Sequence, residues 1–126
     1  MTASALLSLA DVGVTDEGGF ETRLQGINLE ITAGDRLGIA GPTGSGKSTL
    51  LRVMNGLQPV SHGKVCFKGL SLNRYAPPTL RQQVMLVPQE PKLLKQKVQE
   101  TLRYPLQLQQ YSRSECQQRL QEICDF

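Results

Sequence analysis

The sequence predicts an α/β fold in which a phosphate-binding loop joins a short strand to a helix. Glycines, a lysine and a hydroxyl residue stand at the spacing G-x-x-x-x-G-K-[ST] within residues 41–49. Alternating apolar and polar residues at 24–32 and 63–69 indicate half-buried strands, the first of them antiparallel. From Lys92 onward glutamine becomes abundant and apolar residues take helical spacing, which indicates the start of a helical region.

The loop at residues 41–49 contains the residue types that phosphate binding requires. Its glycines let the main chain approach a ligand closely, so that successive N–H groups form an anion nest. The following helix adds unpaired N–H groups and the positive end of its dipole. We expect Lys47 to reach the β- and γ-phosphates of a nucleotide and the Ser48 hydroxyl to bind Mg²⁺. The expected cradle comprises Gly41, Pro42, Thr43, Gly44, Ser45, Gly46, Lys47, Ser48 and Thr49.

Apolar runs on either side of the loop predict a buried core. Residues 36–40 are expected to form a short strand that leads into the loop, and the helix after it is expected to end near Asn55 and Gly56. Residues 84–87 form a continuous apolar run, which is typical of a strand buried on both faces. Pro88 stops that strand, so Gln89 is expected at its carboxyl end.

Local signals predict the elements at both ends of the chain. A strand at 6–11 and a polar loop at 15–22 precede the alternating strand at 24–32, which together indicate a hairpin. Two prolines at 77 and 78 are expected to open a short helix. A helix at 98–108 is expected to be interrupted by its proline at 105. The next helix is expected to begin at Ser112, which has capping-box spacing to Glu115.

Composition argues against several classes of protein. The formal net charge of +3 is too small to indicate a nucleic-acid partner. The three cysteines are odd in number and lack C-x-x-C spacing, so they indicate neither a disulfide framework nor a zinc site. No apolar run approaches the roughly 18 residues of a membrane span, and the first residues lack the features of a signal peptide.

The chain resembles the first half of an ATP-binding cassette (ABC) ATPase domain over essentially all of its length. The resemblance rests on four features: the loop at 41–50, the lead-in segment at 24–35, the β segment at 63–69, and a glutamine loop at 87–91 followed by residues 98–102. It implies a P-loop NTPase core at residues 1–91, with an antiparallel β subdomain. Residues 92–126 are then the incomplete beginning of a helical subdomain.

The same resemblance implies ligands and partners. ATP and Mg²⁺ are the expected ligands, with Lys47 and Gln89 as catalytic residues and Ser48 and Gln89 at the metal. Gln89 is expected to contact Mg²⁺ or the attacking water and to report nucleotide state to the helical region. The expected partners are a second ATP-binding subunit and an integral membrane permease. The chain is expected to lie in the cytoplasm, held at the inner face of the cell membrane by that permease.

Two departures from the family pattern stand out. The family stacks an aromatic residue on adenine, and Asp16 stands near that place in this chain. Phe20 is the nearest aromatic residue, and it either replaces the stacking residue or packs in the core. The family's signature loop, catalytic glutamate and switch histidine would fall beyond Phe126. We therefore expect the 126-residue chain alone to be aggregation-prone and to lack ATPase activity.

Three functions remain open from the sequence. The first is the ATP-binding subunit of an ABC transporter, here a partial or truncated chain. A soluble ABC-type ATPase is the second, and a P-loop kinase or GTPase is the third, although that class leaves the glutamine loop unexplained. Residues 101–107 more weakly resemble iron-export ATPase subunits.

Overall fold

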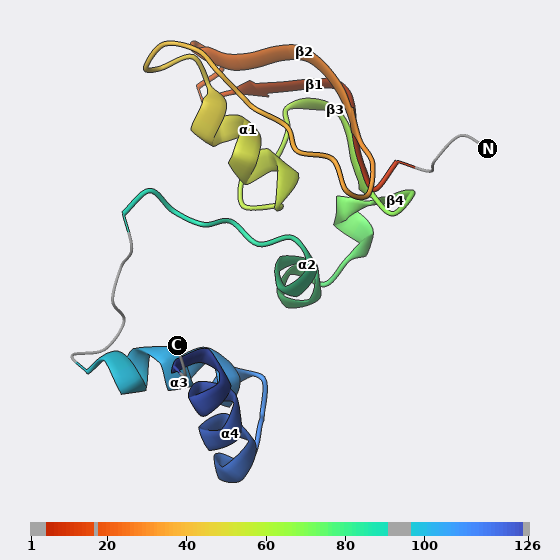
Figure 1. Cartoon of the computed structure of the whole chain (residues 1–126). Helices are drawn as coiled ribbons and strands as arrows, with labels where there is room; N and C mark the ends of the chain where they lie inside the picture. Colours follow the sequence, from red (N-terminus) through yellow and green to blue (C-terminus); the bar gives the residue numbers. More distant parts are fainter. Residues whose placement is uncertain (1–4, 17, 91–96, 125–126) are drawn as a thin grey trace. The chain divides into compact units, whose positions relative to one another are not determined.

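The computed structural model describes residues 5–16, 18–90 and 97–124. The chain divides into two compact units, Met1–Val87 and Pro88–Phe126. Among the described residues, the first unit contains a β-sheet with the helices α1 and α2, and the second contains α3 and α4 (Figure 1). None of the described helices is both long and apolar enough to cross a membrane.

A four-stranded antiparallel sheet organises the first unit, in the order β2-β1-β3-β4. Leu9 of the central strand β1 lies opposite Leu29 of β2 and opposite Val65 of β3. The predicted hairpin, with an antiparallel strand at 24–32, is confirmed. The strands are β1 (Leu7–Thr15), β2 (Thr22–Ile31), β3 (His62–Phe67) and β4 (Leu70–Ser71).

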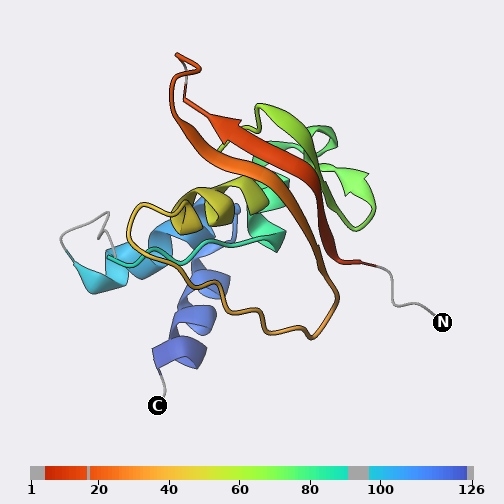
Figure 2. The same cartoon turned by 90° about the horizontal axis from the view of Figure 1, so that it is seen from above.

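Helix α1 (Lys47–Met54) packs on one face of this sheet (Figures 1 and 2). Its Leu50 and Val53 are buried in the same apolar cluster as Val12 and Val14 of β1. The helix ends at the C-cap Asn55, as predicted. The 3-10 turn η1 (Leu72–Arg74) leads to α2 (Pro77–Gln83), which begins at the predicted prolines and adds Leu80 to the cluster.

Two predicted strands are wrong. Residues 36–40 and 84–87 have no regular secondary structure, and the side chains of Met85 and Val87 are 79% and 86% exposed. An apolar run favours burial, but a strand also needs a neighbour whose backbone completes its hydrogen bonds. Within the described residues, strand pairing is confined to β1–β4, so neither run has such a neighbour.

The second unit consists, where it is described, of α3 (Val98–Leu108) and α4 (Arg113–Cys124). The predicted interruption at Pro105 is wrong, because α3 continues through it. Proline removes one hydrogen bond of the helix interior. The carbonyl oxygen of Pro105 still accepts a hydrogen bond from Gln109 N at 3.2 Å, so the helical turn after the proline is formed.

The predicted capping box at the start of α4 is confirmed. Glu115 N donates to Ser112 Oγ at 3.3 Å, while Ser112 N donates to Glu115 Oε2 at 2.8 Å. The Ser112 hydroxyl also donates to Glu115 Oε2 at 2.6 Å. These hydrogen bonds, the hydroxyl's first and then the backbone's, hold the pKa of the exposed Glu115 carboxyl below its ordinary value.

Candidate nucleotide-binding site

The candidate loop at residues 41–46 enters α1 through a left-handed glycine. Gly46 is the N-cap of α1 and has φ 91° and ψ 4°, a conformation that residues with a Cβ rarely adopt. Leu50 N donates to Gly46 O at 2.8 Å and closes the first turn, and Ser45 N donates to Pro42 O at 3.2 Å within the loop. The chain therefore passes from loop to helix without a spacer, which places the first N–H groups of α1 beside the loop.

The ammonium group of Lys47 folds back onto this loop. Its Nζ donates to the backbone carbonyl oxygens of Gly41 and Pro42, both at 2.7 Å, and to Ser45 Oγ at 3.4 Å. These hydrogen bonds keep the positive charge of Lys47 beside the glycine-rich segment. A charged phosphate oxygen is a stronger partner for an ammonium group than a neutral carbonyl is.

The charge around the start of α1 suits an anion. The first turn of α1 contains no acidic residue. The first N–H groups of a helix have no partner within the helix, and they carry the positive end of its dipole. Residues 41–45 are exposed, so a ligand reaches them from solvent.

Close packing against β2 fixes the position of the loop. A Cβ placed on Gly46 would lie 2.6 Å from the carbonyl oxygen of Arg23 and 2.8 Å from Leu24 Cδ2. Only glycine permits this approach, because real Cβ atoms do not come so close to other heavy atoms. The contact joins the loop to the beginning of β2, and the loop motif by itself gives no sign of it.

Ser48 lies in the first turn of α1 and is exposed. Among the described residues, no group of three or more His, Cys, Asp or Glu side chains could hold a metal ion. Mg²⁺ is commonly held by one or two protein ligands together with nucleotide phosphates. An exposed hydroxyl beside the phosphate loop fits that kind of site, and its role at the metal stays a prediction.

Gln89 belongs to the second unit. It is exposed and lies in a stretch without regular secondary structure, just before the described residues break off at 90. The nine loop residues at 41–49 all belong to the first unit. The structure therefore brings the loop residues together, and the role of Gln89 stays a prediction from the sequence.

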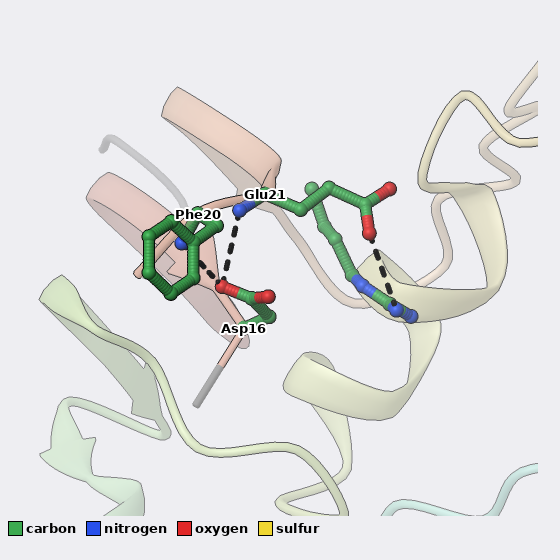
Figure 3. A network of polar contacts seen from close by, with 4 residues as sticks. Asp16, Phe20 and Glu21 are labelled. Atoms are coloured by element: carbon green, nitrogen blue, oxygen red, sulfur yellow. Dashed lines mark hydrogen bonds and ion pairs between the residues drawn. The ribbon is translucent and has the colours of Figure 1, made fainter. Parts of the chain in front are cut away.

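A carboxylate orders the connection between β1 and β2. Asp16 Oδ1 accepts hydrogen bonds from Phe20 N at 2.7 Å and from Glu21 N at 3.0 Å (Figure 3). Asp16 N also donates to Glu21 O at 2.9 Å. The side chain of Phe20 is 94% exposed, which excludes the alternative that this residue packs in the core. The sequence signal for these Asp16 hydrogen bonds is an aspartate at the start of a turn that contains glycine.

Comparison with known proteins assigns the chain to a family. A family model described as ABC transporter matches residues 24–125, which include the loop and Gln89. The chain belongs to the ABC transporter family. Because the match covers most of the chain, the resemblance noted in the sequence is confirmed at the level of the family, with this chain corresponding to the N-terminal portion of an ATP-binding domain.

Curated relatives include importers and other transporters of the ABC transporter family. The chain is 33% identical over 125 residues to the methionine import ATP-binding protein MetN of Helicobacter pylori, covering 96% of this chain and 38% of that protein. It is 41% identical over 73 residues to ABC transporter C family member 5 of Dictyostelium discoideum, covering 58% of this chain and 5% of that protein. The chain thus spans little more than a third of the length of MetN.

Solved structures confirm the fold. An ATP-binding cassette in a dimeric, post-hydrolysis state with ADP and Pi superposes with a TM-score of 0.75 at 28% identity, covering 92% of this chain and 54% of that one. A bacterial Atm1-family ABC exporter with ATP bound gives a TM-score of 0.71 at 24% identity, covering 82% of this chain and 18% of that one. The predicted class, an α/β nucleotide-binding fold with an antiparallel β subdomain, is therefore correct for the part of the domain that this chain covers.

The contact between Gly46 and β2 yields a test with a matched control. Gly34 has the same φ of 91°, but a Cβ there would meet nothing within 4 Å. We expect Gly34→Ala to lower the free energy of unfolding by about 1–2 kcal/mol, the strain of a left-handed residue with a Cβ. Gly46→Ala should lower it further, because the backbone of Arg23 must also move. Urea unfolding measures both values, and equal losses would contradict the packing described here.

Proposed function

We propose that this chain is the ATP-binding part of an ABC transporter, which binds ATP with Mg²⁺ at residues 41–49 and energises transport across a membrane. One observation carries the proposal: the Lys47 ammonium lies 2.7 Å from two loop carbonyl oxygens, directly at the start of a helix that begins without an acidic residue. Positive charge and unpaired N–H groups meet at one exposed place. Membership of the ABC transporter family makes a nucleotide the natural ligand for it.

Different groups of the loop bind different parts of the nucleotide in this proposal. Backbone N–H groups of the loop and of the first turn of α1 surround the phosphates. Lys47 exchanges its carbonyl partners for β- and γ-phosphate oxygens, because a charged acceptor forms the stronger hydrogen bond. The Ser48 hydroxyl would hold Mg²⁺, which would offset the negative charge of the phosphates.

The two regions expected from the sequence have different tasks in this proposal. Residues 1–91 form the nucleotide-binding core, and residues 92–126 begin the helical subdomain. Gln89, close to the end of the core, would ligate Mg²⁺ or accept a hydrogen bond from the attacking water through its amide oxygen, and would pass nucleotide state to the helices. A neutral amide suits both tasks, because its oxygen accepts hydrogen bonds without adding charge.

The proposed partners are a second ATP-binding subunit and an integral membrane permease that holds the chain at the cytoplasmic face of the membrane. The dimeric state of the ADP-bound relative supports the first partner. The transport functions in the names of the curated relatives support the second. Relatives named for different cargo both match this chain, the methionine importer at 33% identity over 125 residues and the mitochondrial iron–sulfur clusters transporter ATM1 of Debaryomyces hansenii at 36% over 81 residues. This supports a role in energy supply, rather than in choice of substrate, for the matched region.

Replacing the loop cation tests nucleotide binding. In the full-length protein, Lys47→Ala should weaken binding of Mg²⁺-ATP and of inorganic triphosphate by at least about tenfold, the lower end expected for a hydrogen bond to a charged group. Isothermal titration calorimetry measures both affinities. Lys64→Ala is the control, since it removes an equal charge from an exposed position on β3. Unchanged affinities in Lys47→Ala would refute the assignment of the phosphate site.

Gln89 is tested in the assembled transporter. Gln89→Ala should leave the affinity for Mg²⁺-ATP nearly unchanged, because most phosphate contacts come from residues 41–49. Substrate transport per ATP hydrolysed should fall, because the link between nucleotide state and the helices is lost. Reconstituted vesicles allow ATPase activity and uptake to be measured together. Normal transport per ATP hydrolysed in this variant would rule out the proposed role.

A further inference from the structure

A cavity of about 420 Å³ lies in the first unit, beside the edge of β3 that faces away from β1. Its volume falls in the range of pockets that hold small organic ligands. The C-terminal end of α1 and the connection after it form one wall, residues 63–65 of β3 form another, and residues 71–73, where β4 passes into η1, form the third. The phosphate loop at residues 41–49 contributes nothing to this lining.

The turn between β3 and β4 shows which way the backbone of β3 points. Lys68 and Gly69 form this two-residue turn with φ 50° and 76°, the pair of left-handed residues typical of a tight hairpin. Such a turn closes with a hydrogen bond between its flanking residues, so Phe67 directs its N–H and C=O toward β4. Tyr75 Oη donates to the same Phe67 O at 2.8 Å. On the other edge, Lys68 N donates to Leu6 O at 2.8 Å, just before β1 begins.

Val65 has the same backbone direction as Phe67, because the direction of the hydrogen-bonding groups along a strand repeats every two residues. Its partner on the β4 side would be Leu72. However, β4 ends at Ser71 and the chain turns into η1, and no hydrogen bond between these described residues joins Val65 to Leu72. Val65 is only 6% exposed and lines the cavity. A buried N–H and C=O thus face the cavity with no strand beside them, although buried backbone groups are rarely left unpaired.

The walls of the cavity favour an uncharged partner for this pair. Val53, Val60 and Leu72 give the lining an apolar surface. Among the described residues of the lining, Lys64 alone is charged. Successive side chains of a strand point to opposite faces, so the exposed side chain of Lys64 and the buried one of Val65 lie on different faces of β3. A ligand therefore needs an N–H and a C=O on one side and an apolar body, and it needs no charge.

We infer that this cavity binds a short extended peptide segment, whose central residue pairs its N–H and C=O with those of Val65 and has an apolar side chain. An extended residue presents both groups on one side, as an antiparallel partner requires. Addition of a strand to a free sheet edge is a general way in which domains bind peptides. The apolar side chain packs against Val53, Val60 and Leu72. This site is separate from the nucleotide site and does not depend on the proposed function.

A single blocked residue is the probe that tests this site. N-acetyl-L-leucine methylamide places one leucine between two peptide groups. Titrated into ¹⁵N-labelled full-length protein, it should bind with a dissociation constant on the order of 1 mM, as expected for so small a ligand. The amide proton signal of Val65 should move downfield and exchange more slowly with solvent, because the Val65 N–H gains an acceptor.

A matched probe and two variants provide the controls. N-acetyl-N-methyl-L-leucine methylamide lacks the central N–H, so it should bind at least about fivefold more weakly, because the Val65 carbonyl oxygen is left without a donor. Val60→Phe should abolish binding by filling the cavity, with thermal unfolding showing that the fold is retained. Lys64→Ala should bind the probe as the natural chain does, because its side chain lies on the other face of β3.

Three results would each overturn the inference. The first is a Val65 amide signal that does not respond to about 20 mM probe, well above the expected dissociation constant, which would show that water completes the pair. The second is equal binding of the two probes, and the third is normal binding by Val60→Phe. If Val60→Phe does not fold, the two probes and the Val65 signal decide the matter on the natural chain. The phosphate site is tested separately, by the loss of triphosphate binding in Lys47→Ala.

Discussion

The contact of Gly46 with the backbone of Arg23 is the constraint on which the candidate site depends. It sets the start of α1, and with it the helix dipole, against the beginning of β2. The buried side of α1 then packs on the sheet through Leu50 and Val53, so the same short helix serves the core and the ligand. Because β2 pairs with β1 from Thr22 to Ile31, the loop is attached to a strand that the sheet holds in place.

Sequence patterns predicted β2 and the start of α4 because both patterns are local. Alternation at 24–32 matches β2, and the spacing of Ser112 to Glu115 matches the cap of α4. The runs at 36–40 and 84–87 failed as strands, since apolar composition favours burial but does not supply a backbone partner. Pro105 shows the same gap, because its local tendency to interrupt a helix did not decide the outcome and α3 continues through it to Leu108.

The candidate site was predictable in its residues and not in its contacts. The spacing of glycines, lysine and serine located the loop at residues 41–49, and the comparisons confirmed the family. The carbonyl partners of Lys47 and the approach of Gly46 to β2 depend on the folded chain. Phe20 illustrates the difference: the sequence left open whether it packs or stacks, and its exposure removes the first possibility.

Nuclear magnetic resonance of the backbone amides tests the central claim most directly, that the loop attached to β2 is the nucleotide site. In a titration of ¹⁵N-labelled full-length protein with Mg²⁺-ATP, the amide signals of residues 41–48, proline excepted, should shift in a saturable way. Those of Arg23 and Leu24 should shift with them, because these residues contact Gly46. Saturable shifts elsewhere in the chain, with the loop amides unchanged, would contradict the account.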